Sequence, residues 1–438
     1  EFLTVPTLVI VAFLLMAAGS YTIDRTEITA FQTMRGVLKT RVFADSRATS
    51  ELLGTIAGGI ITVTSIIISL LLVALQQSAA SLTHQVFDQF LRRRTNQFYF
   101  GFFIGLSLFA LLTLATVTES FNPVFGASLA FLLTMAGLYI LILLLYTTIN
   151  QMRPAVIIEA IHAHTLTARQ SQVSLILKTQ RSPRAGGLIC RPVKAHRHGF
   201  VTHIDVDAAG VAATDLGKDV EIVLRVSIGS YVAFEDVIAE VRMEAQKETA
   251  SLEKSVQDAV HFENQRNIGG DPAYGIEQME MIAWTSISTA KSDPAPGLLI
   301  IRNLRDLLAH WAAEDNQSRQ EESLPIVYTD DVFSRLMEAF ETLAVVASES
   351  MQHQNFAEVL RTFAIMFDRL SPDQQARAED IILRIISALG DHVLTAELEA
   401  TLSELVLTLD KSARITTAAA VQAAQNRLKL SVGKLHSR

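Results

Sequence analysis

Apolar residues gather in four long stretches within the first third of the chain, and these stretches predict membrane-spanning helices. A helix needs roughly 20 apolar residues to cross the hydrocarbon core of a bilayer. The stretches that meet this requirement are Phe2–Tyr21, Leu52–Gln77, Tyr99–Thr118 and Val124–Ile149. The polar segment ESFNPVF joins the last two, so we expect them to form a helical hairpin. The first stretch lacks a small-residue cleavage site, and we expect it to be retained as a span.

The second stretch continues past the apolar run with an amphipathic pattern. Leu82, Val86 and Phe90 recur four residues apart, and polar residues occupy another face. A helix from Leu52 to Leu91 would be about 60 Å long at a rise of about 1.5 Å per residue. This is twice the thickness of the bilayer core, so we expect the second helix to project into the cytoplasm.

Small and polar residues form a stripe along the second stretch. They are Gly54, Gly58, Thr62, Ser65, Ser69 and Gln76, at spacings of four, four, three, four and seven residues. These spacings place them on one face of a helix. Gly54 and Gly58 also form a small-xxx-small pattern, which lets two helices approach closely in lipid. The third stretch holds a second such pattern at Gly101 and Gly105.

Two interpretations of the stripe remain open. In the first, it packs against another helix, either of the same chain or of a second copy, and its hydroxyl groups bond to their own backbone. In the second, it is the wetted face of a pore, since hydroxyl-lined helices suit hydrated ions. The four stretches contain no Asp, Glu, Lys, Arg or His. This argues against a proton relay or a transporter with a carboxylate at mid-membrane.

Composition and charge agree with a membrane protein that carries a large soluble tail. The chain is 50% hydrophobic with a net charge of −8, so no basic face indicates nucleic acid as a partner. Basic residues flank the spans on both sides. Arg92, Arg93, Arg94 and Arg153 lie directly at helix ends, where the positive-inside rule is strongest. We therefore expect a multi-pass protein of the bacterial inner membrane with cytoplasmic termini.

The tail begins as a helix and then changes character after a break rich in Gly, Pro and Arg at residues 180–187. The segments GFVTHIDVD, VEIVLRV and IGSYVAFEDVIAEV follow, with the alternation and turns of β-strands. From Glu244 to the end the apolar residues recur at helical steps. The expected fold is thus membrane α-helical with an α+β tail. Its domains are a four-helix transmembrane domain (1–164), a small β domain (165–243) and a helical cytoplasmic domain (244–438).

The β domain resembles the barrel-sandwich hybrid fold of biotinyl and lipoyl domains and of transporter adaptors. The resemblance rests on GFV at its start and on G-S-Y-V-x-x-x-D-V-I-A-E-V near its end. Carrier domains of this kind modify a lysine in an exposed hairpin, usually between methionines. The nearest lysine is Lys218 in LGKDV, which lacks that context. The resemblance therefore implies a structural barrel without a cofactor.

Taken together, the segments IAGGIITVTSIIISLLLVALQQ, HGFVTHIDVD and QRNIGGDPAYGIEQMEMIAWTSIS resemble the bacterial predicted membrane protein family called domain of unknown function 2254. The resemblance covers most of the chain and implies its topology and domain order, but no activity. The family's pattern of a basic residue, an Asp-Pro, a Gly and a second Asp-Pro falls here on Arg266, Asp271, Gly275 and Asp293. Where the family usually reads SPGINDP, this chain reads STAKSDP.

The tail shows no pattern typical of an active site. His196, His198 and His203 lie close together, but Cys, Asp or Glu at ligand spacing does not follow before Asp205, so we expect no metal. IGGDPAYG lacks the Lys-Ser/Thr of a phosphate loop. Asp271 and Asp293 each precede a proline, as helix N-caps do. The alternative is a ligand or partner site that these two loops form with Arg266 and Gly275.

The sequence therefore favours an integral membrane protein without enzyme activity, assembled as a homo-oligomeric channel. In this hypothesis Thr62, Ser65, Ser69 and Gln76 face the pore and Gly54 and Gly58 are close-packing positions. Arg92, Arg93 and Arg94 form a ring of charge at the inner mouth, and the tail acts as gate or sensor. The alternative is a membrane-anchored scaffold whose soluble tail recruits a protein partner.

Overall fold

The structure is a computed structural model. It describes residues 3–26, 45–81, 94–151, 153–184, 188–217, 219–244, 249–288, 293–315, 323–390 and 393–431. The chain divides into two compact units, Glu1–Val156 and Ile157–Arg438, which we call the N-terminal unit and the C-terminal unit. Among the described residues, the first contains four apolar helices, and the second combines helices with short strands.

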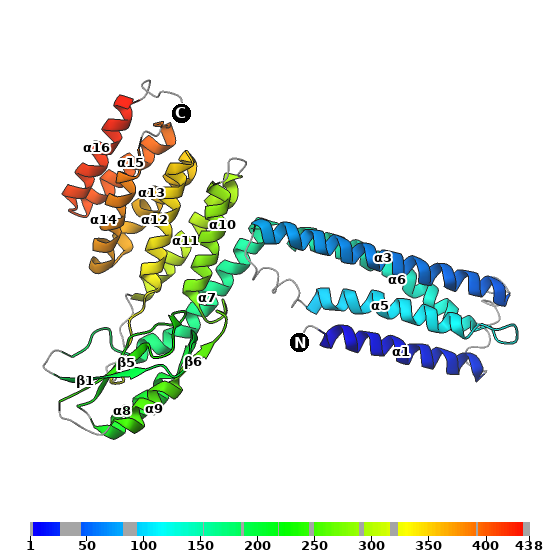
Figure 1. Ribbon diagram of the computed structural model, residues 1–438. Helices are drawn as coiled ribbons and strands as arrows, with labels where there is room; N and C mark the ends of the chain where they lie inside the picture. Colours follow the sequence, from blue (N-terminus) through cyan, green and yellow to red (C-terminus); the bar gives the residue numbers. More distant parts are fainter. Residues whose placement is uncertain are drawn as a thin grey trace. The chain divides into compact units, whose positions relative to one another are not determined.

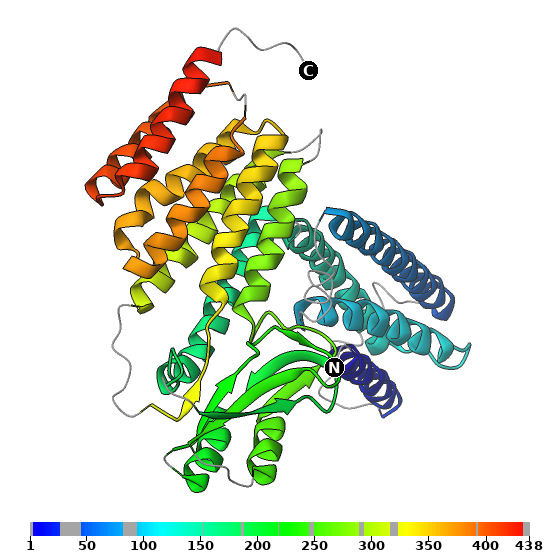
Figure 2. The same cartoon turned by 60° about the vertical axis from the view of Figure 1, so that its left-hand side comes forward.

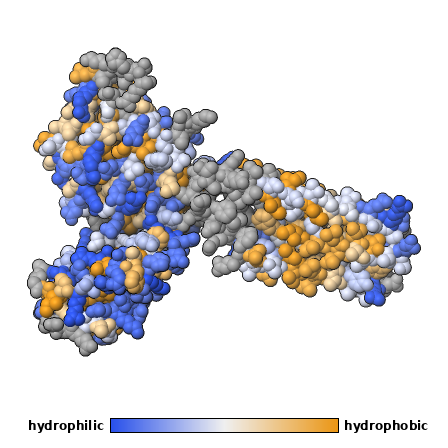
Figure 3. All heavy atoms as spheres, in the orientation of Figure 1, coloured by the Kyte–Doolittle hydropathy of each residue, from blue (hydrophilic) through white to orange (hydrophobic). Residues whose placement is uncertain are grey.

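The N-terminal unit consists of α1 (Thr4–Arg25), α3 (Ser46–Ser81), α5 (Arg94–Ala115) and α6 (Val124–Gln151) (Figure 1). Each helix is long and apolar enough to cross a membrane, which confirms the prediction of four spans. Figure 3 shows apolar residues covering much of the visible side of this unit. The predicted continuation of the second helix through residues 82–91 lies outside the described residues.

Helix α5 is the central helix of the N-terminal unit. In α5, 56% of the span is buried, against 22%, 28% and 17% in α1, α3 and α6. It contacts all three other helices, and Phe103, Leu106 and Phe109 on it are fully buried. The other helices therefore keep most of their surface for lipid or for a second protein.

Two glycines let α1 lie directly against α5. A β-carbon placed on Gly101 would come within 2.9 Å of the Pro6 Cα and the Val9 Cβ, and one placed on Gly105 within 2.9 Å of the Phe13 Cγ. Because such separations are too short for real carbon atoms, any larger residue would force the helices apart. The small-xxx-small pattern of α5 is thus a packing contact within the chain.

A buried carboxylate joins the end of α1 to the beginning of α6. Asp24 is 2% exposed, and its two oxygens accept hydrogen bonds from the backbone N–H groups of Phe125 at 3.0 Å and Gly126 at 2.9 Å. The first N–H groups of a helix have no partner within the helix. Asp24 thus acts as an N-cap supplied by another helix, and its charge suits the positive end of the helix dipole.

The C-terminal unit begins within α7 (Pro154–Lys178) and continues into two small sheets. The first sheet has the order β1 (Ile189–Lys194), β5 (Val237–Met243), β3 (Glu221–Leu224) and β7 (Ile326–Val327). The second has the order β4 (Tyr231–Val232), β2 (Gly199–Ile204) and β6 (Val260–Glu263). The β3–β7 pair is parallel and the other pairs are antiparallel. Helices α8 (Val206–Leu216) and α9 (Ala250–Ala259) lie side by side next to these sheets (Figure 2).

Three features of this region differ from the sequence prediction. Strands β6 and β7 lie beyond Glu244, where only helices were expected. The two residues of β7 are too few to show alternation, and the alternation of β6 is limited to the four residues VHFE directly after α9. Helix α8 replaces the end of the segment interpreted as a strand. Its N-cap is Asp205, whose side chain accepts the N–H of Ala208 at 3.0 Å. The resemblance to a barrel-sandwich hybrid stays a prediction.

The rest of the C-terminal unit is a stack of helices in two layers (Figures 1 and 2). The helices are α10 (Pro272–Ser288), α11 (Pro294–Asp315), α12 (Val332–Glu349), α13 (His353–Met366), α14 (Pro372–Ser387), α15 (Ala396–Lys411) and α16 (Ile415–Ser431), and the 3₁₀ turn η2 (Phe367–Arg369) follows α13. Each even-numbered helix contacts the next even-numbered one, and the same holds for the odd-numbered ones. Phe340, Phe356 and Phe363 are fully buried in this stack. Such stacking of helix pairs is typical of repeat proteins.

The Asp24 cap yields a prediction about the N-terminal unit. Replacing Asp24 by Ala leaves two buried N–H groups of α6 without an acceptor, which costs about 1–3 kcal/mol. We expect Asp24→Ala to lower the thermal midpoint of the purified protein in detergent, and Asp24→Asn to lower it less because one acceptor oxygen remains. Glu119→Ala, at an exposed carboxylate in the loop before α6, is the control. An equal loss in the control and Asp24→Ala would contradict this role.

Candidate functional site

The stripe of α3 points away from its own bundle. Gly58, Thr62, Ser65 and Ser69 are exposed and Gly54 is half-buried. A β-carbon placed on Gly54 or Gly58 would meet nothing within 4 Å. Gln76 belongs to the same helix, but its side chain lies outside the described part of the chain. No other part of the described chain therefore packs against the described part of the stripe.

The opposite face of α3 is the one that holds the helix in the bundle. Leu53, Ile56, Ala57, Ile60 and Ile67 are buried in the core shared with α5 and α6. Because these residues alternate with the stripe at helical spacing, the two faces cannot both turn inward. The described residues therefore do not show the stripe packed against a helix of the same chain. Packing against a second copy, the other form of the first interpretation, and a wetted pore face both stay predictions.

Two hydroxyl groups of the stripe, those of Thr62 and Ser69, bond to the helix itself. Thr62 Oγ1 donates to the Gly58 carbonyl at 2.9 Å, and Ser69 Oγ donates to the Ser65 carbonyl at 2.9 Å. A hydroxyl bonded in this way is stable in lipid and still has oxygen lone pairs for water or for a neighbouring chain. The geometry thus suits both a helix interface and a wetted surface.

Of the predicted ring of arginines, only Arg94 lies among the described residues. It is exposed and is the first residue of α5. Arg92 and Arg93 lie outside the described residues.

Arg266, Asp271 and Gly275 come together at the beginning of α10. Arg266 Nε lies 2.7 Å from Asp271 Oδ2, its Nη1 pairs with Glu277, and its guanidinium lies 4.5 Å from the centre of the Tyr274 ring. Burial lowers the pKa of Arg266, but the carboxylates of Asp271 and Glu277 outweigh it and raise the pKa above its ordinary value. The cluster is a compact network in which one arginine pairs with two carboxylates, Asp271 and Glu277.

The other contacts of the predicted ligand or partner site lie within the fold. Asp271 accepts the N–H of Tyr274 at 3.0 Å and so caps α10, and a β-carbon on Gly275 would overlap the Thr165 side chain of α7. Asp293 accepts the N–H of Ala295 at 3.0 Å at the start of α11. The Asp293 carbonyl accepts the hydroxyl of Ser286 near the end of α10, so most of the length of this helix, about 20 Å, separates Asp293 from Asp271 and the two do not form one site.

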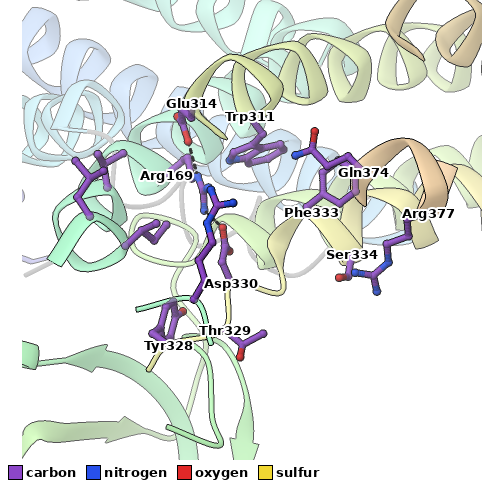
Figure 4. A pocket seen from close by; sticks show the side chains of 14 residues that line it. Arg169, Trp311, Glu314, Tyr328, Thr329, Asp330, Phe333, Ser334, Gln374 and Arg377 are labelled. Carbon is purple, nitrogen blue, oxygen red and sulfur yellow. Dashed lines mark hydrogen bonds and ion pairs between the residues drawn. The ribbon is translucent and has the colours of Figure 1, made fainter. Parts of the chain in front are cut away.

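A pocket that the sequence did not reveal opens between α7, α11, the β7–α12 segment and α14 (Figure 4). It has a volume of about 390 Å³, and we call it the Trp311 pocket. Arg169 and Trp311 lie together on one wall, while Phe333, Gln374 and Arg377 lie on the other. Because four separate elements supply these residues, spacing along the chain could not bring them together in advance.

Arg169 is the best-anchored charge in this pocket. Its side chain is 9% exposed, its Nε lies 2.8 Å from Glu314 Oε2, its Nη1 lies 2.7 Å from Asp330 Oδ2, and its guanidinium stacks 5.7 Å from the Trp311 ring. Burial lowers the pKa of Arg169, but Asp330 and Glu314 more than compensate and raise it. Burial also raises the pKa of the neighbouring Tyr328 hydroxyl.

The histidines noted in the sequence do not form a metal centre in the part of the chain that the structure describes. His203 on β2 stacks on His261 of β6, with ring centres 5.5 Å apart. Among the described residues there is no group of three or more His, Cys, Asp or Glu side chains that could hold a metal ion.

Comparison with known proteins gives one match. The model of a family described as "Predicted membrane protein (DUF2254)" matches residues 1–356. Neither the curated proteins nor the solved structures contain a match. The matched range includes the stripe, Arg169 and the Arg266 cluster, and it ends within α13, so that α14 to α16 lie beyond it.

The Arg169 network yields a prediction about the C-terminal unit. Arg169→Ala would leave Glu314 and Asp330 largely buried without a counter-ion, which costs about 3 kcal/mol. We expect this loss in chemical unfolding of the purified protein followed by circular dichroism. The control is Arg225→Ala, which breaks a pair with Glu240 whose arginine is 52% exposed and which contributes less than about 1 kcal/mol. Similar losses in both variants would show that Arg169 does not anchor the unit.

Proposed function

The chain belongs to the predicted membrane protein family called domain of unknown function 2254, and we propose that it forms a homo-oligomeric channel in which the stripe of α3 faces a shared axis. The membrane would be the bacterial inner membrane, with cytoplasmic termini. The C-terminal unit, including a barrel-sandwich-like β domain, would act as the gate or sensor. The proposed permeant species is a small hydrated ion.

The observation that carries the proposal is that this stripe of small and hydroxyl-bearing residues is exposed and that no other part of the described chain packs against its glycines. The exposed faces of α1 and α6 consist of large apolar side chains such as Leu8, Leu15, Leu138 and Ile142. The exposed face of α3 presents Gly58, Thr62, Ser65 and Ser69 beside Ile61, Ile66 and Ile68. Small and hydroxyl-bearing residues are enriched where membrane helices meet one another.

The two small-xxx-small patterns of the chain support a contact between copies. Helix α1 of the same chain packs against Gly101 and Gly105, whereas a β-carbon placed on Gly54 or Gly58 would meet nothing within 4 Å. If both patterns serve close helix packing, the second needs a helix from another copy. A ring of α3 helices would then bring the hydroxyl groups to the axis.

The charge at the end of the spans bears on ion selectivity. Arg94 is exposed where α5 begins, and α5 runs antiparallel to α3 beside it. Together with Arg92 and Arg93 of the sequence, it would give each subunit three positive charges near one mouth. A ring of such charges favours anions.

A membrane-anchored scaffold is the second candidate. The two-layer stack from α10 to α16 favours it, because stacked helix pairs offer extended surfaces for binding other proteins. In this alternative the stripe of α3 only holds copies together, and no ion crosses.

The test is ion flux through the purified protein in liposomes. We expect chloride flux in the wild type, and a loss of about tenfold or more in Ser65→Leu and Ser69→Leu, because added leucines dewet a narrow pore. Thr147→Leu is the matched control, since Thr147 of α6 also donates to its own helix, at 2.8 Å to the Leu143 carbonyl, but lies off the stripe.

All variants are first checked for the same assembled mass as the wild type. The channel proposal fails if the wild type passes no ion under salt gradient, voltage or tension, or if the serine variants conduct as well as the control. The first outcome would favour the scaffold.

A further inference from the structure

Helix α10 exposes two large apolar side chains near its end. Trp284 is 48% exposed and Met281 is 51% exposed, whereas Ile282, Ala283 and Ile287 of the same helix are buried. The two exposed residues lie three positions apart and therefore on one face of the helix. Large apolar side chains that are exposed together point to a surface that covers them.

The same end of the α10–α11 pair carries no charge. The last eight residues of α10, MIAWTSIS, and the first eight of α11, PAPGLLII, contain no Asp, Glu, Lys, Arg or His. We call these residues, 281–288 and 294–301, the hairpin end. The other parts of both helices are charged, with Glu277 and Glu280 on α10 and Arg302, Arg305 and Asp306 on α11. Because a surface that faces water is normally rich in charged residues, the hairpin end suits a less polar neighbour.

Contacts within the C-terminal unit show that α10 runs antiparallel to α7. Gln172 Nε2 of α7 donates to the Gly270 carbonyl, just before α10, at 3.1 Å. Further along α10, a β-carbon on Gly275 would overlap the side chain of Thr165, which comes earlier in α7. The end of α10 therefore lies towards the beginning of α7.

Helix α11 runs parallel to α7, so its beginning lies at the same level. His162 Nε2 lies 3.0 Å from Asp306 Oδ2, and Arg169 Nε lies 2.8 Å from Glu314 Oε2. Residue numbers on the two helices thus increase together. Both halves of the hairpin end are therefore near the first turn of α7.

The first turn of α7 directly follows the fourth span. Helix α6 ends at Gln151 and α7 begins at Pro154. Trp284 follows Gly275 by nine residues, or about 14 Å, which brings it level with this first turn. Even a fully extended chain from Gln151 to Ile157 covers no more than about 22 Å. The hairpin end is thus tied closely to the place where the chain leaves the bilayer.

We propose that the hairpin end lies on the lipid headgroups of the bilayer that holds the four spans, with Trp284 as its anchor. Tryptophan combines an apolar ring with an N–H donor, and it is enriched where membranes meet water. Met281 adds apolar surface beside it. Arg153, exposed between α6 and α7, supplies a positive charge for the headgroup phosphates. This contact does not depend on whether the protein conducts ions.

The two tryptophans of the chain make the contact measurable. The full-length protein is reconstituted in liposomes that contain phosphatidylcholine with a nitroxide spin label on the headgroup, which quenches nearby tryptophan fluorescence. We expect the label to quench the wild type. In Trp284→Phe we expect the quenching to fall at least about twofold, because the remaining Trp311 is 3% exposed and so shielded from lipid.

An exposed tryptophan away from the hairpin end is the matched control. His310→Trp, made in the Trp284→Phe variant, places an indole at a 53% exposed position of α11, about 24 Å along the helix from Pro294. We expect soluble acrylamide, but not the lipid label, to quench this tryptophan.

Three results would overturn the proposal. If the lipid label leaves the wild-type emission unchanged while acrylamide quenches it, Trp284 faces water. If neither quencher acts on Trp284, protein covers it, as a second copy of the chain would. If the label quenches the tryptophan of His310→Trp as strongly as it quenches Trp284, the hairpin end is not a specific contact. The first two results need no variant, so they remain decisive even if a substitution prevents folding.

Discussion

The contact between α1 and α5 at Gly101 and Gly105 is the constraint on which the arrangement of the four apolar helices depends. In lipid, apolar burial does not hold helices together as it does in water, so close packing and a few polar contacts must do so. The two glycines let α1 lie on α5, and Asp24 then fastens the end of α1 to the start of α6. With α5 enclosed in this way, α3 has one face on the bundle and one face left over. The leftover face carries the stripe.

The C-terminal unit is organised around charges of opposite sign that its helices bring together. Arg169 of α7 joins α11 and the β7–α12 segment through Glu314 and Asp330, and Arg266 joins the start of α10 through Asp271 and Glu277. Each of these networks is largely buried, so its loss would be felt in stability. The first network also borders the Trp311 pocket.

Sequence patterns predicted those parts of the fold whose signal is local. The prediction of four spans is confirmed. It could be made because a long run of apolar residues is recognisable in the sequence by itself. Strands β6 and β7 were missed because four and two residues pair with segments far away in sequence. The first two residues of α8, Val206 and Asp207, were assigned to a strand because GFVTHIDVD alternates up to Asp205, which caps the helix instead of continuing the strand.

The candidate sites, too, could be predicted from the sequence only where the pattern is local. The stripe could be found from helical spacing alone, but which way it faces depends on how α5 packs. The loops at Asp271 and Asp293 share a motif, yet α10 holds them apart. No sequence pattern identified Arg169 as a site residue, because its partners Glu314 and Asp330 lie 145 and 161 positions further along the chain.

The most direct test of the central claim compares one glycine from each small-xxx-small pattern. The purified protein and its variants Gly58→Leu and Gly105→Leu would be measured for assembled mass in detergent and for thermal stability. If the stripe binds a second copy, Gly58→Leu should be folded and monomeric, because a side chain there meets nothing within the described chain. Gly105→Leu should lose about 1–3 kcal/mol or more of stability, because it drives α1 away from α5. A Gly58→Leu variant with the same assembled mass as the wild type would contradict the account.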